Sequence, residues 1–390
     1  MAKPVIVSAA RTAIGRSFKG ALANVPSEQL AITILPEVVR RAGIDPSAVD
    51  DVILAELNYG GGDLARHAAV AVGMESVPGQ AVNRHCTGSL TAIGNGAAHI
   101  VSGMERVIVA GGVQSLSSAP VMKWRVPGTA EFVEPWMPPS HPETPDAPTL
   151  DMAITVGWNT AKKAGISRED MDAWALRSHQ RAIAAIDAGK FADEIVPLKV
   201  QQPDGSVTDF AVDEFPRRDT TLERLASLPV LHPEIEGFSI TAGNSSGIND
   251  AAAAVALVGD DYAAAEGLEV LGTVRAWANT AVTPADNGLA AGKVIGKILD
   301  RTGLKPSDVA LWEINEAFAS VPIAACREHG LDEELVNFSG SGCSLGHPIS
   351  ASGARMVTTL LYELRRRGGG IGVAAMCAGG GQGGALVVEV

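Results

Sequence analysis

Residues 41–49 read Arg-Ala-Gly-Ile-Asp-Pro-Ser-Ala-Val, and residues 301–309 repeat the pattern as Arg-Thr-Gly-Leu-Lys-Pro-Ser-Asp-Val. An apolar segment that predicts a β-strand follows each copy. A second match joins residues 107–112 to residues 372–380, where a predicted strand precedes paired glycines in both stretches. Two matches in the same order indicate an internally duplicated α/β fold.

The first copy alternates predicted strands with predicted helices. Residues 4–9 and 52–57 have the apolar composition of strands, whereas residues 27–42 and 64–73 have helical spacing. This strand–helix–strand order predicts parallel strands. Residues 89–102 predict a helix with almost no polar face, which must therefore be buried.

The rest of the chain predicts further helices and a second set of strands. Ser167 and Asp170 form a capping box for a helix at 167–188, and the small residues at 251–257 are expected to be helical. Residues 290–302 predict another helix. Strands are expected at residues 191–200, 206–213, 268–278, 309–314, 371–377 and 385–390.

Between residues 117 and 150 the periodic pattern stops. Eight prolines in this stretch exclude a regular helix or a central strand, so we expect a long surface excursion. Excursions of this length usually serve function or oligomerisation.

Composition and charge limit the class of protein. With 390 residues, 46% of them hydrophobic and 19% charged, the chain can form two or three packed domains. A formal net charge of −13 and a pI near 5.1 argue against nucleic acid or an anionic membrane as a partner, because either would need a basic face. No segment reaches the ~18 apolar residues of a membrane span, and the apolar run near the start is too short for a signal peptide.

The four cysteines, Cys86, Cys326, Cys343 and Cys377, are widely separated. Their spacing matches neither a zinc ribbon nor a C-x-x-C redox motif, so no metal site is expected. Reduced thiols in a chain of this size are typical of a reducing compartment, and we expect a cytoplasmic protein.

The stretch Gly342–Gly353 surrounds His347, which lies between Gly346 and Pro348. A histidine held in such a rigid loop, with its imidazole accessible, can act as an acid/base group. Taken by itself, it is also compatible with a plain turn residue.

The duplication pairs His347 with Cys86. His347 follows Gly303 by 44 positions and Cys86 follows Gly43 by 43, so both occupy equivalent loop-to-helix turns. In a pseudo-twofold pair these turns face each other, as a nucleophile and its base require.

The residue type and position of each further candidate suit a specific chemical role. Cys86 precedes a buried helix, whose positive end is expected to lower the pKa of the thiol. Cys377 precedes a run of glycines with bare N–H groups, and a second thiol suits proton transfer to or from carbon. Asn315 directly follows a predicted strand and could anchor a water or a substrate oxygen. The alternatives are an inert buried thiol and an ordinary turn asparagine.

Five separated motifs, in order along nearly the whole chain, resemble those of the thiolase family of acetyl-CoA C-acyltransferases. They are VNRHCTGS (82–89), TAGNSSGIND (241–250), WEINEAFA (312–319), LGHPISASGAR (345–355) and CAGGGQGG (377–384).

The resemblance implies two βαβαβαββ halves stacked in a five-layered α-β-α-β-α arrangement, with a loop domain inserted into the first half. The expected division is residues 1–117 for the first part of the N-terminal half and 118–245 for the loop domain. Residues 246–268 would complete the N-terminal half, and residues 269–390 would form the C-terminal half.

The resemblance also implies a reversible, ping-pong cleavage of a 3-ketoacyl-CoA by CoA through an acyl-Cys86 intermediate. His347 would activate Cys86, and Cys377 would exchange a proton with carbon. The N–H groups of Cys86 and Gly379 would form one oxyanion hole, and His347 with a water held by Asn315 the other.

Further positions follow from the same resemblance. Arg217 and Ser246 match positions that contact CoA, and Met152 and Cys343 are expected at the acyl pocket. CoA would be a co-substrate, with no permanently bound cofactor. The resemblance implies a homodimer or homotetramer, and it leaves open a partner subunit of a β-oxidation complex.

The chain departs from the family pattern at several places, and these departures leave the acyl pocket, and so the substrate, undetermined. The usual His-Met-Gly is replaced by Asp-Met-Ala at residues 151–153, and the glycine after His-Pro-Ile is Ser350. The favoured function is a degradative 3-ketoacyl-CoA thiolase. The alternatives are an acetoacetyl-CoA-forming biosynthetic thiolase and a non-catalytic thiolase-like protein that binds acyl-CoA or lipid. A ketosynthase is disfavoured because such enzymes lack the cysteine that precedes the glycine run.

Overall fold

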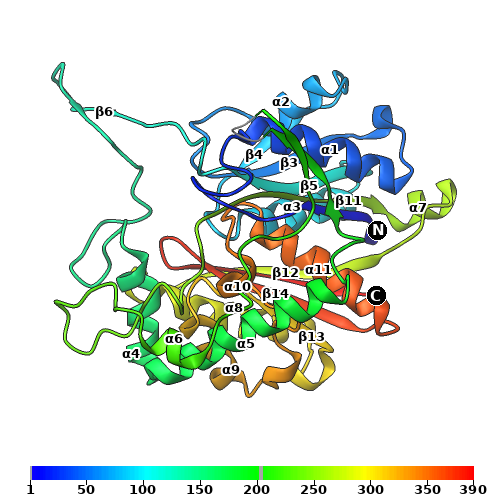
Figure 1. The fold of residues 1–390 in the computed structure, drawn as a ribbon. Coiled ribbons are helices and arrows are strands. Elements are labelled where there is room, and N and C mark those ends of the chain that lie inside the picture. Colours follow the sequence, from blue (N-terminus) through cyan, green and yellow to red (C-terminus); the bar gives the residue numbers. More distant parts are fainter. Residues whose placement is uncertain (1, 202–204) are drawn as a thin grey trace.

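The computed structural model describes residues 2–201 and 205–390 and builds them around one 11-stranded sheet (Figure 1). Its main path runs β13–β14–β15–β12–β1–β11–β5–β3–β4, with β2 beside β11 and β8 beside β1. The strands are β1 Pro4–Thr12, β2 Gly15–Arg16, β3 Asp51–Glu56, β4 Gly79–Val82, β5 Val107–Gln114, β8 Ile195–Val196, β11 Asn249–Gly259, β12 Gly272–Ala281, β13 Leu311–Ile314, β14 Ile371–Ala378 and β15 Gln382–Glu389.

The pairing pattern confirms the duplication. In the first half β1 pairs antiparallel with β11, β11 antiparallel with β5, and β5 parallel with β3. In the second half β12, β15, β14 and β13 repeat this order and these directions. The two repeated sequence stretches also fold alike, because Gly43 and Gly303 both end a helix with φ near +70° and a 3₁₀ turn follows each of them (η1 Pro46–Ala48 and η4 Pro306–Asp308).

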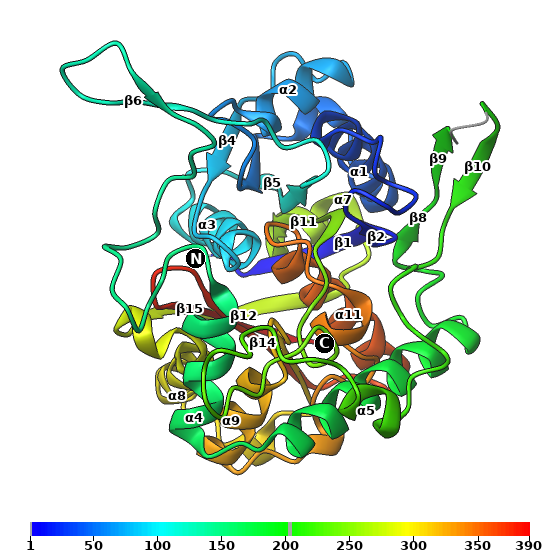
Figure 2. The ribbon, with the colours of Figure 1, turned by 60° about the vertical axis from the view of Figure 1, so that its left-hand side comes forward.

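Helices cover both faces of each half-sheet and make the five layers that the resemblance implies (Figures 1 and 2). Helices α3 and α11 pack against each other between the halves, α1 and α2 cover the outer face of the first half, and α8 and α9 lie on the outer side of the second. Their bounds are α1 Ser27–Ala42, α2 Leu64–Ala71, α3 Gly88–Ser102, α7 Asp260–Glu266, α8 Ala290–Thr302, α9 Ser320–His329, α10 Gly342–Leu345 and α11 Ser352–Arg366.

The prediction of a helix at residues 251–257 was wrong. These residues lie in β11, where every residue is buried between β1 and β5 and helices α1, α3 and α11 pack against the strand. Burial on both faces removes the polar alternation that normally marks a strand, and small side chains let the helical layers approach closely. Tertiary packing therefore overrides the helix propensity of alanine here.

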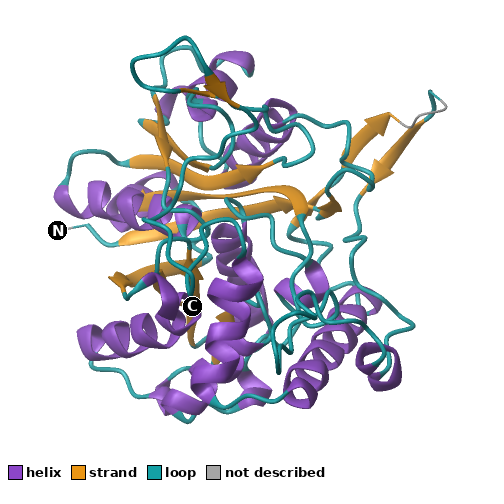
Figure 3. Ribbon diagram, turned by 90° about the vertical axis from the view of Figure 1, so that its left-hand side faces the viewer, coloured by secondary structure: helices purple, strands orange, loops and turns teal. Residues whose placement is uncertain are grey.

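The excursion at 117–150 carries a short hairpin, β6 Trp124–Arg125 and β7 Phe132–Val133, that projects from the molecule (Figure 2). A second projecting hairpin consists of β9 Leu198–Gln201 and β10 Val207–Phe210 (Figure 3). The remaining elements are η2 Ala153–Trp158, α4 Asn159–Ala164, α5 Arg168–Asp187, α6 Leu222–Ala226, η3 Pro284–Leu289 and η5 Glu333–Leu335, and the capping box of Ser167 and Asp170 is present at the start of α5. Among the described residues, no helix has both the length and the apolar character needed to cross a membrane.

A buried ion cluster ties the segment between residues 118 and 245 to the sheet. Arg11 at the end of β1 donates two hydrogen bonds to Asp213, at 2.7 and 2.9 Å, and one to Glu194 at 3.0 Å, and Arg11 is only 1% exposed. Asp213 also accepts a bond from the backbone N–H of Ile14.

We predict that Asp213→Ala lowers the free energy of unfolding by about 3 kcal/mol, because it leaves a buried guanidinium short of partners. Urea unfolding measures this loss. The matched control is Asp219→Ala, which breaks the exposed pair with Arg224 and should cost far less. Equal losses in the two variants would contradict the account.

Candidate active site

A cavity of about 470 Å³ opens where the loops of the two halves meet. Its lining is mostly apolar, and it includes Cys86 from the first half and His347 and Cys377 from the second. Side chains from both duplicated turns thus share one cavity, as the matched sequence positions predict.

Cys86 lies between β4 and α3, and the preceding residue, His85, has a left-handed backbone with φ of +46°. The backbone N–H groups of Gly379 and of Cys86 itself interact with the Cys86 thiol and act to lower its pKa. Two N–H donors that converge on a nucleophile can also stabilise an oxyanion formed beside it.

The expectation that the helix end lowers the pKa of Cys86 was wrong. Burial raises the pKa of the thiol to about 11, and the two N–H donors offset this only in part. At neutral pH Cys86 is therefore a thiol, and a nucleophilic role would require a base to take its proton.

The loop that carries His347 is fixed by Asn249 of β11. The backbone N–H of His347 donates to Asn249 Oδ1 at 3.1 Å, and Asn249 Nδ2 donates to the carbonyl of Gly15. Gly346 has φ of +102°, and a Cβ there would lie 2.3 Å from Asn249 Oδ1. Only glycine therefore lets the loop approach Asn249 this closely.

The hydrogen bonds of His347 leave one ring nitrogen ready to accept a proton. Nδ1 lies 2.6 Å from Ser352 Oγ, and the Ser352 hydroxyl donates to the carbonyl of Pro348. Because that hydroxyl has a single proton, Nδ1–H must be the donor to Ser352, and Nε2 is left as the acceptor. Burial, and secondarily the positive charge of Arg355, lower the pKa of His347 to about 4, so the imidazole is neutral at pH 7.

Cys377 and Asn315 complete the group of predicted residues. Cys377 ends β14 at the cavity, and burial followed by the proximity of Cys86 raises the pKa of its thiol. Asn315 is fully buried, and its Nδ2 lies 3.4 Å from His347 Nε2. Its Oδ1 has no hydrogen-bond partner among the described residues, so this oxygen is free to hold a water or a ligand.

The other predicted residues differ in their placement. Met152 and Ser246 line the cavity, whereas Cys343 and Arg217 are not among its lining residues. Cys343 lies 1% exposed with its Sγ–H directed to the carbonyl of Glu316, and the N–H of Arg217 donates to His179. For these two residues, the predicted roles at the acyl pocket and in CoA binding have no support in this geometry.

Sequence reasoning overlooked several polar residues of the cavity, among them His85 and Asn287. His85 precedes the nucleophile within a motif that was singled out, so its position was a usable signal. Asn287 lies in η3, and the sequence around it has no distinguishing pattern. Its place in the cavity depends on how η3 packs, which the sequence alone does not give.

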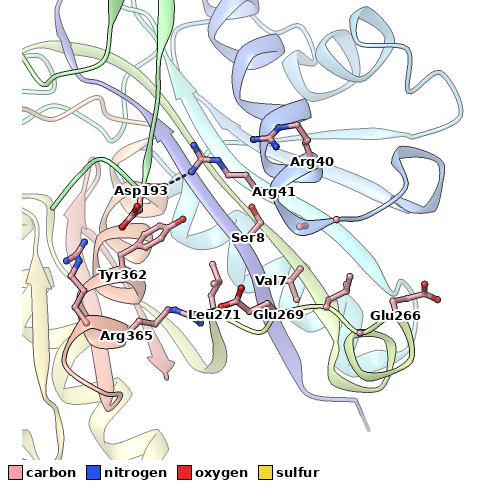
Figure 4. A pocket seen from close by; sticks show the side chains of 15 residues that line it. Val7, Ser8, Arg40, Arg41, Asp193, Glu266, Glu269, Leu271, Tyr362 and Arg365 are labelled. Atoms are coloured by element: carbon pink, nitrogen blue, oxygen red, sulfur yellow. Dashed lines mark hydrogen bonds and ion pairs between the residues drawn. The ribbon is translucent and has the colours of Figure 1, made fainter. Parts of the chain in front are cut away.

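A larger hollow of about 840 Å³ lies elsewhere, beside the C-terminal end of α1 and the middle of β1 (Figure 4). Its arginines are already engaged: Arg41 donates to the carbonyl of Asp193 and Arg365 pairs with Glu269. The hollow brings together none of the candidate catalytic side chains.

The buried, neutral His347 predicts a pH dependence of stability. The unfolded chain binds a proton at this histidine below pH 6.5, but the folded chain binds it only below about pH 4. The unfolded state therefore holds more protons in this window, and the free energy of unfolding falls as the pH decreases, by up to roughly 3 kcal/mol.

Denaturant titrations from pH 7 to 4 measure this effect, and His347→Gln should flatten the curve. Some slope should remain, because burial also lowers the pKa of His179 to about 4. Parallel curves for wild type and variant would contradict the assignment.

Comparison with known proteins identifies what the chain resembles. Residues 4–261 match the family model "Thiolase, N-terminal domain" and residues 268–390 match "Thiolase, C-terminal domain". The crystal structure of the Bacillus anthracis acetyl-CoA acetyltransferase superposes with a TM-score of 0.92 at 37% identity and covers 100% of this chain and 99% of that one.

Curated relatives carry several related names. An acetyl-CoA acetyltransferase of Pseudomonas aeruginosa is 40% identical over 398 residues, which cover 98% of each chain. The β-ketoadipyl-CoA thiolase of the same organism is 40% identical over 405 residues, again 98% of each. A 3-ketoacyl-CoA thiolase of Bacillus subtilis is 37% identical over 404 residues, 100% of each.

Proposed function

The chain belongs to the thiolase family of acyltransferases, and from this premise we propose that it is a degradative enzyme that cleaves 3-ketoacyl-CoA with CoA. What carries the proposal is the convergence of Cys86, His347 and Cys377 on one cavity, with Asn315 beside His347. The cavity is large and mostly apolar, as an acyl chain longer than acetyl would require.

In the first half-reaction, His347 Nε2 takes the proton of Cys86, and the thiolate attacks the keto carbon of the substrate. The N–H groups of Cys86 and Gly379 stabilise the oxyanion. The bond between the α-carbon and the keto carbon then breaks. The thiol of Cys377 protonates the departing carbanion, which leaves as acetyl-CoA.

In the second half-reaction, CoA attacks the acyl group on Cys86 and gives its proton to the Cys377 thiolate. The Cys86 sulfur leaves and recovers its proton from His347, so both thiols and the neutral imidazole are restored. Asn315 Oδ1, which has no partner among the described residues, would hold a water that helps His347 stabilise the enolate oxygen of acetyl-CoA.

The proposal treats CoA as a co-substrate and includes no permanently bound cofactor. Ser246, which lines the cavity, is the better placed of the two proposed CoA contacts. We propose a homodimer or homotetramer, with the hairpin of β6 and β7 as the tetramer contact. Its exposed Trp124, Phe132 and Val133 supply an apolar surface for it.

The second candidate function is synthesis of acetoacetyl-CoA from two acetyl-CoA molecules. Several relatives, including the one from Pseudomonas aeruginosa, are named acetyl-CoA acetyltransferase, and this observation favours it. The chemistry is the same path reversed, so substrate preference decides between the two.

CoA-dependent thiolysis of a panel of 3-ketoacyl-CoAs, from acetoacetyl to long-chain and ring-bearing, tests the proposal. Higher kcat/KM for longer substrates supports the degradative enzyme, whereas turnover confined to acetoacetyl-CoA supports the synthetic one. Binding of acyl-CoA without turnover on any substrate would indicate a non-catalytic thiolase-like protein.

A further inference from the structure

Asn287 has a buried side-chain amide for which the described part of the chain supplies no hydrogen-bond partner. It is 1% exposed, and neither Nδ2 nor Oδ1 has a hydrogen-bond partner among the described residues. Burying such a group unpaired costs about 1 to 3 kcal/mol. An arrangement this unfavourable in the free protein calls for a ligand that pairs with the amide.

The same asparagine lines the catalytic cavity. It lies in η3, and the chain just before η3 is bonded to the glycine turn after Cys377, because the N–H of Val282 donates to the carbonyl of Gly381 at 2.7 Å. It shares the lining with Met152 and Val156. The free amide therefore belongs to the cavity that would receive the acyl group.

The charges around the cavity further limit the chemical class of the ligand. Among the described residues that line the cavity, none is a lysine, arginine, aspartate or glutamate. His85, which also lines the cavity, is neutral at pH 7, since burial lowers the pKa of its imidazole. A buried carboxylate on the acyl chain would lack a cation, so a neutral oxygen suits this site better.

We propose that Asn287 determines substrate specificity by hydrogen bonding to a neutral oxygen, a hydroxyl or carbonyl, on the acyl chain of the 3-ketoacyl-CoA. This inference rests on the proposed thiolase reaction and adds the class of acyl group. Asn287 Nδ2 can donate to either kind of oxygen, and Oδ1 can accept from a hydroxyl. A plain hydrocarbon chain would leave the amide unpaired and bind less well.

Three substrates of equal chain length test the proposal: 3-ketohexanoyl-CoA, its 6-hydroxy derivative and 3-ketoadipyl-CoA. For the wild type we expect kcat/KM to be at least about tenfold higher for the hydroxylated substrate than for the plain one. The nearly isosteric Asn287→Leu should abolish that preference. Preference for the plain chain, or for the carboxylate-bearing one, would overturn the proposal.

Thr160→Val is the matched control. Thr160 Oγ1 is likewise buried and unpartnered among the described residues, but Thr160 does not line the cavity, so this variant should keep the wild-type preference. If Asn287 serves the substrate, Asn287→Leu should also raise the melting temperature of the free protein. A lower melting temperature with unchanged preference would mean a structural role and overturn the proposal.

These experiments distinguish a failure of the Asn287 proposal from a failure of the proposed thiolase function. Thiolysis with a substrate preference that Asn287→Leu leaves unchanged overturns this inference alone. Absence of thiolysis on every substrate, acetoacetyl-CoA included, overturns the proposed function and this inference with it.

Discussion

Cys86→Ala is expected to reduce CoA-dependent thiolysis by at least about 10⁴-fold, because it removes the sulfur that is proposed to form the covalent intermediate. The N–H donors of Cys86 and Gly379 would remain, and so would substrate binding. The loss should therefore appear in kcat, with little change in the affinity for acyl-CoA. Steady-state thiolysis and a binding titration measure the two quantities.

Cys326→Ala is the control for this experiment. Cys326 is a buried thiol on α9, outside the cavity lining, and burial raises its pKa to about 12. Its removal should leave turnover close to that of wild type. Substantial thiolysis by Cys86→Ala would show that Cys86 is not the nucleophile.

Cys377→Ser is expected to separate the two chemical steps of the reaction. Burial keeps Cys377 protonated at neutral pH, as the acid in cleavage must be, and its conjugate base is strong enough to take a proton from carbon. A serine hydroxyl is a far weaker acid. We expect a loss of about 10³ to 10⁴-fold in thiolysis, while acylation of Cys86 by acetyl-CoA persists.

Exchange of the acetyl-CoA methyl protons with deuterated water reports on Cys377 directly. Wild type should catalyse the exchange and Cys377→Ser should not, although both form acyl-Cys86. If the serine variant exchanges protons at the wild-type rate, another group performs the proton transfer.

Local signals and internal repetition predicted much of this molecule. The repeated stretches at 41–49 and 301–309 predicted a duplicated sheet. The matched positions of Cys86 and His347 predicted that both residues lie at one site, and both line the same cavity. Both predictions depend only on the order and spacing of residues along the chain, and the sequence gives these completely.

Properties that depend on what surrounds a residue were not predictable in this way. The predicted helix at residues 251–257 is part of strand β11, because the elements packed on both faces of this segment, and not its own pattern, make it a strand. The pKa of Cys86 was expected to fall and instead rises, since desolvation outweighs the N–H donors. The unpaired amide of Asn287 is visible only once every possible partner has been placed.

The most direct test of the central claim is a single half-reaction followed by mass spectrometry. The protein is mixed with a 3-ketoacyl-CoA in the absence of CoA, quenched in acid and digested. The account predicts release of about one acetyl-CoA per active site, together with the shortened acyl group on the peptide that contains Cys86. Acetyl-CoA released without an adduct, or an adduct on Cys377 in place of Cys86, would contradict it.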